Sequence, residues 1–312
     1  MITLIVPTRN RGYTLRLTAR SYYEQALVTE IIFVDDAGTD DTAEVVAAIA
    51  SNYPETETRI LRNEERKGAA YNRIAGYRAA RNDYVLYCDD DEYLERDYAK
   101  VCLEKMHATG AAIVSGRRII KTKEERPEDT VRRFGDGLTD EPPFNYRFCE
   151  FNRDATFSGD LALPLTNSII LTRRETLERF GYDPFYAKAN GYREESDFQM
   201  AIYCAGLDIL VTNEVHSIHL SREECRTGGQ RFNRFSRLYW NVFYTNYFYG
   251  KYWDRYAERA GLSRSKNAAV AAFALYQVYF LFIKPFRRLL PGREESRPAA
   301  RPRGKESAPP AI

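Results

Sequence analysis

Short apolar runs alternate with segments of helical spacing along the first part of the chain. Apolar runs that end in polar loops lie at Ile2–Val6, Glu30–Val34, Thr58–Leu61 and Tyr84–Cys88. The segments between them repeat apolar residues every three or four positions, as Val45, Val46 and Ile49 do, and this spacing predicts helices. A strand–helix alternation of this kind predicts an α/β domain with a Rossmann-like, largely parallel central sheet flanked by helices.

The alternation continues less regularly to about residue 220. We expect strands near residues 168–171 and 209–211, with two histidines just past the second in 215–220, and helices over 174–180 and 194–205. The charge-dense segment 117–133 is predicted to be a mobile surface loop and is a candidate lid.

From residue 231 the chain becomes aromatic and basic, and the run 268–283 is apolar except for polar Gln277. The run is shorter than the roughly 20 residues that span a bilayer. It therefore fits a core helix, or a helix in a membrane interface with the basic residues that follow toward the headgroups, a peripheral contact through 268–290. Pro, Arg, Ala and Ser dominate residues 293–312, which predicts disorder. We divide the chain into an α/β domain (1–225), a helical C-terminal appendage (226–292) and a tail (293–312).

Composition is that of an ordinary globular protein. Of the 312 residues, 44% are hydrophobic and 29% charged, which is enough for a large core. A net charge of +2 gives no reason to expect a nucleic-acid partner. The five cysteines are odd in number and form no CxxC pair, so reduced thiols in the cytoplasm fit better than disulfides or structural zinc. Because the first residues lead directly into a strand pattern, we expect no signal peptide.

Three adjacent carboxylates, those of Asp89, Asp90 and Asp91, follow the fourth apolar run directly. Like charges at this spacing are costly unless a cation neutralises them, and carboxylate oxygens are the ligands of Mg²⁺ and Mn²⁺. The alternative is a solvated acidic turn. Parallel strands end at one edge of a sheet, where ligands bind, so we expect the loops after Val6, Val34 and Cys88 to converge there.

The order of the motifs carries more information than any single one. The N-terminal motifs are, in order, Val6–Arg11, Phe33–Asp40, Lys67–Arg73 and Tyr87–Asp91. The later ones are Thr166–Ser168, Tyr182–Phe185 and Arg193–Phe198 followed by Ala205-Gly206. This series resembles the family 2 glycosyltransferases, which are inverting enzymes of the GT-A (nucleotide-diphospho-sugar transferase) fold. The resemblance covers roughly residues 1–220, and 221–290 more weakly.

The resemblance implies a metal role for the acidic triplet. Asp89 and Asp91 match the DxD element, which holds Mn²⁺ or Mg²⁺ against the diphosphate of the donor, and Asp90 would support it or contact the ribose. A histidine can be the third ligand in this family. We favour His219, with His216 close behind.

The resemblance also implies a nucleotide pocket. Backbone groups of Pro7, Thr8 and Arg9 would line the base and ribose, although Arg9 can equally be a surface side chain. Of the two acids Asp35 and Asp36, we favour Asp36 for the base. Lys67 or Arg73 would face the diphosphate as charge-assisted hydrogen-bond donors. The alternative for both residues is a place on a solvated helix face.

Glu195 takes the position of the family's catalytic base, the second acid of its "ED" pair. The usual residue there is Asp, and Glu is one methylene longer. Asp197 is the second candidate. Acids in the first turn of a helix can also serve only to favour the helix dipole.

These roles predict a metal-dependent inverting transferase. The donor would be a nucleotide sugar, a UDP-sugar on family frequency, and the acceptor a glycan or a lipid-linked glycan. Aromatic residues of the C-terminal region, such as Tyr239, Tyr244 and Trp253, would form an acceptor platform or pack against the domain. We expect a cytoplasmic enzyme, peripheral at the inner face of the membrane. The alternative is a non-catalytic nucleotide-sugar binder. An aspartyl phosphotransferase fits less well, because its acids would directly follow the first strand and here they follow a later one. A nicotinamide enzyme fits less well, because no GxGxxG follows the first strand.

Overall fold

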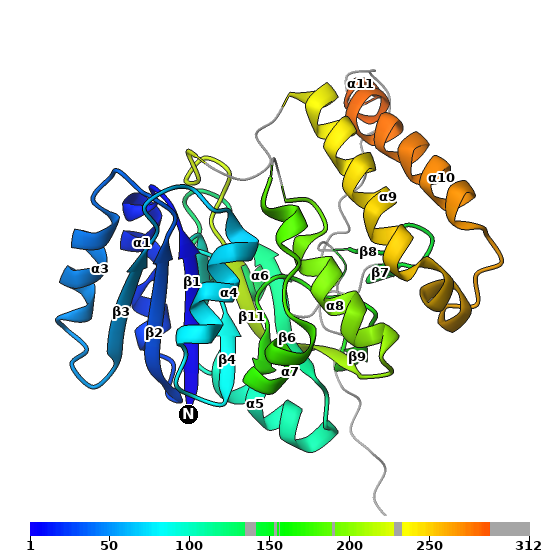
Figure 1. Cartoon of the computed structure of the whole chain (residues 1–312). Helices are drawn as coiled ribbons and strands as arrows, with labels where there is room; N and C mark the ends of the chain where they lie inside the picture. The colour runs from blue at the N-terminus through cyan, green and yellow to red at the C-terminus, as the bar shows by residue number, and fades with distance from the viewer. Residues whose placement is uncertain (135–141, 153–154, 156, 189–190, 228–232, 288–312) are drawn as a thin grey trace, which may run out of the picture.

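Half of the central sheet is the alternating unit that the apolar pattern predicts. The computed structural model describes residues 1–134, 142–152, 155, 157–188, 191–227 and 233–287. Its first elements are β1 (Ile2–Thr8), α1 (Gly12–Thr18), α2 (Arg20–Tyr23), β2 (Val28–Asp35), α3 (Thr42–Ala50), β3 (Glu57–Arg62), α4 (Ala69–Ala79) and β4 (Tyr84–Tyr87). The strands β3, β2, β1 and β4 are adjacent in that order and parallel (Figure 1). Their carboxyl ends therefore meet at one edge, as expected.

The second half of the sheet mixes directions. Its elements are β5 (Glu92–Leu94), α5 (Tyr98–Thr109), β6 (Ile113–Ile120), α6 (Pro127–Phe134), β9 (Asp160–Ala162), β10 (Leu171–Arg173), α7 (Arg174–Phe180), the 3₁₀ helix η1 (Pro184–Ala187), α8 (Glu194–Cys204) and β11 (Ile209–His219). Strand β10 lies antiparallel between β4 and β6, and β11 runs parallel to β6. The short strands β5 and β9 pair antiparallel with β11. A separate two-stranded sheet joins β7 (Phe144–Asn145) and β8 (Glu150–Phe151).

The two faces of the sheet are covered by different helices. Because side chains alternate along a strand, Leu4 and Val6 of β1 join a core with α1, α2, α3 and α5, whereas Ile5 joins a core with α4, α7 and α8. Burial on both faces explains why β1 and β2 read as continuous apolar runs rather than alternating ones.

Close packing of α4 on β1 makes Gly76 a sensitive position. A Cβ added there would overlap the side chain of Ile5. We expect Gly76→Ala to lower the free energy of unfolding by about 1–3 kcal/mol, although alanine is the better helix former. Gly250 is the matched control, because nothing lies within 4 Å of a Cβ added there; Gly250→Ala should gain about 0.8–1 kcal/mol. Urea unfolding midpoints of the two variants should move in opposite directions, and equal shifts would contradict the packing argument.

The prediction of a loop over the whole charge-dense segment 117–133 was wrong, because only residues 121–126 lie outside a helix or strand. Strand β6 continues through Arg117 and Arg118 to Ile120, and α6 begins at Pro127. Both arginines are buried. Their charge is accommodated by partners from distant parts of the chain, and charge density alone does not reveal such partners.

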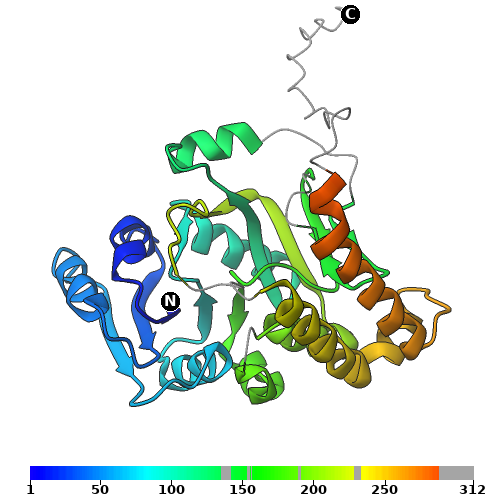
Figure 2. The same ribbon diagram turned by 90° about the horizontal axis from the view of Figure 1, so that it is seen from above.

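The C-terminal region is a helical hairpin beside the sheet, on the side away from β3 (Figure 2). It consists of α9 (Arg234–Arg259), α10 (Lys266–Val278), the π-helix η2 (Tyr279–Ile283) and α11 (Lys284–Arg287). Tyr244 and Trp253 are buried and so serve packing, whereas Tyr239 is 60% exposed. Buried Asn241 of α9 donates to Gln277 Oε1 of α10 at 3.1 Å, which explains the one polar residue in the apolar run. The predicted tail, 293–312, lies outside the described residues.

Candidate active site

The acidic triplet lies at the carboxyl end of β4, in the turn that leads into β5. The ladder between β5 and β11 pairs Glu92 with His219, and Leu220 N–H donates to the Asp91 carbonyl at 3.0 Å. Backbone pairing thus fixes Asp91 beside His219. Two residues more than a hundred positions apart become neighbours because one short strand pairs with the end of a long one.

Buried arginines surround the acids. Arg11 Nε lies 3.5 Å from Asp90 Oδ1, and its Nη2 lies 3.5 Å from Asp91 Oδ2. Arg118 Nε donates to Glu92 Oε1 at 2.6 Å, and its Nη2 lies 3.7 Å from Asp89 Oδ2. The chain therefore supplies part of the positive charge that the sequence argument assigned to a cation alone.

Carboxyl groups outnumber guanidinium groups in this cluster. Three guanidinium groups (Arg11, Arg73 and Arg118) pair with six carboxyl groups (Asp89, Asp90, Asp91, Glu92, Glu194 and Glu195). Burial raises the pKa of Asp90 to about 7 and that of Glu92 to about 8. Burial also acts on Asp89, but Arg73 and Arg118 outweigh it and lower the pKa of this carboxyl. Asp89 is thus held ionised inside a site with excess acid.

His219, and not His216, faces the acids. Ligand atoms of Asp91, His219 and Cys225 lie within 4.8 Å of one another, as do those of Asp89, Asp91 and Glu92. Burial and Arg118 lower the pKa of His219, and its Nδ1 has no hydrogen-bond partner within the described part of the chain. The ring is therefore neutral with a nitrogen available to a ligand. His216 Nδ1 is instead 2.9 Å from Glu95 Oε2.

Arg73 joins the triplet to the acidic helix α8. It is buried on α4, so the solvated-face interpretation does not hold for it. Its Nη2 donates to Asp89 Oδ1 at 3.2 Å and to Glu195 Oε1 at 3.1 Å, while Nη1 bonds Glu194. Burial raises the pKa of Glu194 to about 8. Lys67, by contrast, is partly exposed, and its Nζ pairs with Glu65.

Glu195 and Asp197 point to different surroundings. The Glu195 side chain is 36% exposed. Asp197 is buried and accepts from Tyr186 Oη at 2.9 Å, Lys251 Nζ at 2.6 Å and Tyr252 Oη at 3.2 Å. Of these two acids, Glu195 is the one that solvent reaches.

The loops after β1 and β2 lie side by side. Asp36 N–H donates to the Thr8 carbonyl at 2.9 Å, so Pro7, Thr8 and Asp35 form adjacent ends of paired strands. Asp35 Oδ1 accepts from Gly38 N–H at 2.8 Å. Arg9 is exposed.

The Asp36 carboxylate ties the end of β2 to the start of α4. Oδ1 accepts from Lys67 N–H at 2.7 Å and from Asn63 Nδ2 at 2.9 Å, and Oδ2 accepts from Gly68 N–H at 3.0 Å. The sequence-predicted nucleotide residues are thus gathered at one rim, with Lys67 contributing its backbone.

Several residues at this site were missed from the sequence. Arg11 and Ser168 lie inside recognised motifs, and Ser168 Oγ donates to Asp89 Oδ2 at 2.9 Å, so proximity to a motif could have indicated them. Arg118 and Cys225 have no local signal.

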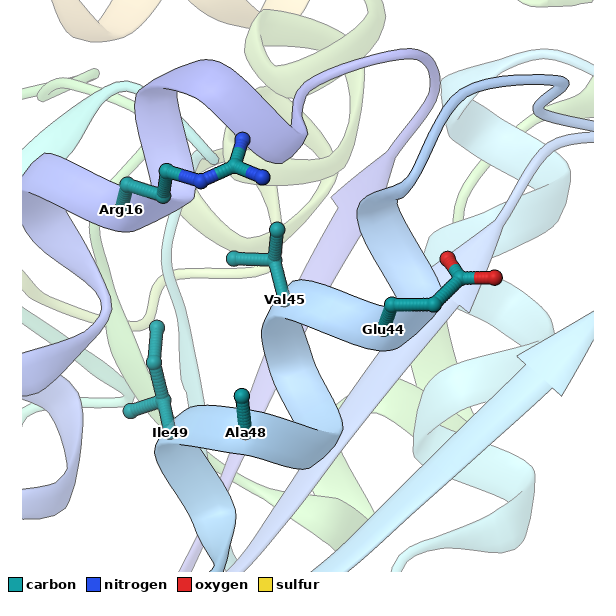
Figure 3. Close-up of a pocket in the computed structure, with 5 residues that line it drawn as sticks. All are labelled: Arg16, Glu44, Val45, Ala48 and Ile49. Atoms are coloured by element: carbon teal, nitrogen blue, oxygen red, sulfur yellow. The ribbon is translucent and has the colours of Figure 1, made fainter.

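A small hollow is lined by Arg16 of α1 and by Glu44, Val45, Ala48 and Ile49 of α3 (Figure 3). It brings together none of the predicted site residues and plays no part in the site.

Comparison with known proteins agrees with this arrangement. The model of the family described as "Glycosyl transferase family 2" matches residues 3–180. A Campylobacter jejuni protein named GalNAc(5)-diNAcBac-PP-undecaprenol beta-1,3-glucosyltransferase is 28% identical over 200 residues, 62% of this chain and 60% of its own. The succinoglycan biosynthesis protein ExoO of Rhizobium meliloti is 28% identical over 36% of this chain. In the first curated relatives the match spans only about a third of their length.

Solved structures share the fold at low identity. S. aureus TarS in complex with UDP-GlcNAc has a TM-score of 0.57 at 14% identity and covers 89% of this chain and 72% of its own. The mannosyltransferase PcManGT from Pyrobaculum calidifontis, in complex with GDP-Man and Mn²⁺, has a TM-score of 0.52 at 17% identity, covering 91% and 71%. The predicted GT-A arrangement with C-terminal helices is confirmed. This chain belongs to glycosyl transferase family 2.

Proposed function

We propose that this enzyme transfers a sugar with inversion from a nucleotide-diphosphate donor to a hydroxyl group of a glycan or lipid-linked acceptor, with the help of Mn²⁺ or Mg²⁺. The observation that carries the proposal is the position of Arg73. One guanidinium nitrogen contacts both Asp89, on the side of the leaving group, and Glu195, on the side of the acceptor. Inversion by single displacement needs a base and a leaving-group site held at a fixed separation, and a shared buried cation provides that.

Donor binding is assigned to the rim formed by the loops after β1 and β2. Backbone groups of Pro7, Thr8 and Arg9 would line the nucleoside, and Asp35 and Asp36 would meet the base or ribose. The Arg9 side chain, being exposed, contributes less than its backbone. Lys67 would reach the diphosphate only by leaving Glu65. UDP remains our choice of nucleotide on family frequency.

The residues present fit a divalent cation. Excess carboxylate, the partly exposed Asp89 and the unpartnered Nδ1 of His219 form a donor set suited to Mn²⁺ or Mg²⁺. Asp89, Asp91 and His219 would hold the ion, and Asp90 would support them through Arg11. When bound, the ion neutralises the charge that develops on the departing diphosphate.

Glu195 is assigned the proton of the attacking hydroxyl. Its carboxylate is accessible, and Arg73 orients it through the hydrogen bond to Oε1. Asp197 is not free for that role, because Lys251 and two tyrosines use its oxygens. It would instead hold α8, and therefore Glu195, in place.

The proposal extends to the acceptor and to the location of the enzyme. A relative's name includes a PP-undecaprenol acceptor, which supports a lipid-linked glycan for this chain. We assign catalysis to residues 1–225, with 226–292 as the appendage, and place the enzyme in the cytoplasm at the inner membrane face.

The metal part of the proposal predicts that chelation stops turnover. Nucleotide release from a panel of UDP-, GDP- and TDP-sugars should rise on addition of Mn²⁺ and fall to background with EDTA. Asp89 and Asp91 are themselves anionic, so they can hold a diphosphate only through a bound cation. Excess Mn²⁺ should restore it. Undiminished release in EDTA would remove the metal role, and donor binding without any release would favour a non-catalytic binder.

A further inference from the structure

Exposed hydrophobic side chains are concentrated at one end of the C-terminal hairpin. Among the described residues, fifteen large hydrophobic side chains are exposed, and eight of them lie here. The eight, which we name the hairpin tip, are Phe235, Tyr239 and Phe243 of α9 and Leu275, Val278, Tyr279, Phe280 and Ile283 of α10 and η2. Phe235 is 76% exposed and Leu275 is 72% exposed. Soluble monomers rarely expose so much apolar surface in one place, so the tip calls for a partner.

The geometry of the two helices places these residues at the same end of the hairpin. Phe235, Tyr239 and Phe243 are four residues apart and so share one face of α9. Because the helices are antiparallel, the start of α9 lies beside the end of α10, and the rings of Phe235 and Phe282 are 5.1 Å apart.

The charge around the tip selects the chemistry of its partner. Residues 233–253 and 266–287 contain no Asp or Glu, whereas Arg234, Arg237, Lys284 and Arg287 lie within them. The following residues, 288–312, carry six basic and three acidic side chains. An apolar surface on helical segments that carry cations and no acids matches the interface of an anionic bilayer, where apolar groups enter the headgroup region and cations meet lipid phosphates.

We propose that the hairpin tip docks on an anionic lipid bilayer and thereby turns the mouth of the active site toward that bilayer. The start of α9 and α11 lie on the same side of the molecule as the carboxyl ends of the parallel strands (Figure 1). The Phe243 ring is 5.9 Å from that of Phe185 in η1. The next residue, Tyr186, bonds Asp197 on the helix that carries Glu195. The orientation rests on the proposed function, because it assumes that Glu195 marks the acceptor side.

Docking at the surface fits the structure better than a membrane span. Lys266–Ile283 is 18 residues long and apolar enough to be a candidate span. Its inner face, however, packs on α9 through Ala269 and the buried Asn241–Gln277 pair. A span would expose these two amides to lipid, which is costly, whereas a docked tip leaves them paired.

Flotation of the full-length chain with vesicles tests the proposal. We expect flotation with phosphatidylcholine–phosphatidylglycerol vesicles, little with phosphatidylcholine alone, and loss at high salt. The variant Phe235→Glu/Leu275→Glu should lower vesicle partitioning at least about tenfold, because two apolar anchors are removed. Arg234→Glu should lower binding to the anionic vesicles by about fivefold or more.

The matched control is Leu17→Glu/Ile60→Glu. These side chains are 54% and 38% exposed on α1 and β3, away from the tip, so this variant should float like the unmodified chain. Failure of the unmodified chain to float, or equal loss in both double variants, would overturn the proposal. So would a dimer that the tip variant dissociates without any vesicle binding, since the tip would then join two copies.

Nucleotide release without membranes is measured in parallel. The tip variant should retain it, because its two changes lie outside the active site. The two measurements therefore test the two proposals separately. If no nucleotide is released, the proposed function is contradicted; if the chain does not float with the vesicles, the docking is contradicted.

Discussion

Glu195→Gln is expected to lower sugar transfer by about 10²–10⁴-fold, the range of a lost general base. Glutamine keeps the shape of the side chain and can still contact Arg73, but it cannot accept a proton from the acceptor hydroxyl. Donor binding should change little, because the triplet and the nucleotide rim are untouched. Initial rates and nucleotide titrations of the same preparation would separate the two effects.

Two variants bracket this result. Glu195→Asp restores the acid usual in the family and should keep more activity than Glu195→Gln, since only reach is lost. Asp197→Asn should instead loosen the fold, because Lys251 would lose the carboxylate that it contacts at 2.6 Å. Transfer that survives Glu195→Gln intact would remove this residue as the base.

Arg73→Leu is expected to cost about 3–5 kcal/mol of folding free energy, as for a broken buried ion pair. Three carboxylates converge on this guanidinium, and none of the leucine atoms could satisfy them. Urea denaturation would measure the loss.

Exposed Arg78, on the same helix, supplies the control. Arg78→Leu should alter stability by no more than about 0.5 kcal/mol. Arg73→Lys keeps the charge but cannot make several directed contacts, so it should fall between the two. If Arg73→Leu proved as stable as Arg78→Leu, the acids would not depend on a shared cation.

The hydrophobic pattern predicted the parallel half of the sheet, because the strands and helices of that half can each be recognised from their own residues. Strands buried on both faces are apolar throughout, as in β1 and β2, and the helices between them have a clear period. The rest depends on pairing between distant segments. The strand predicted at 209–211 continues to His219 as β11, because β6 lies beside it with a register shift between Thr212 and His216. Periodicity does not encode that neighbour.

The candidate site divides in the same way. Asp36, Asp89 and Glu195 stand in recognisable motifs, and the structure gathers all three at one rim. The choice between His219 and His216 needed the pairing of β5 with β11. The buried roles of Arg73 and Arg118 needed the carboxylates that surround them, because a basic residue in a sequence is otherwise expected to be exposed.

The α8–α9 contacts limit how modular this enzyme is. Arg193, just before α8, has a φ of 77° and donates to the Phe148 carbonyl at 2.9 Å, with its Nε 3.3 Å from Thr245 Oγ1 of α9. Lys251 of α9 bonds Asp197 of α8. The helix that carries Glu195 is therefore clamped by residues of the appendage. Exchange of the C-terminal helices for those of another family member would keep Glu195 in place only if the incoming segment brought equivalents of Thr245 and Lys251.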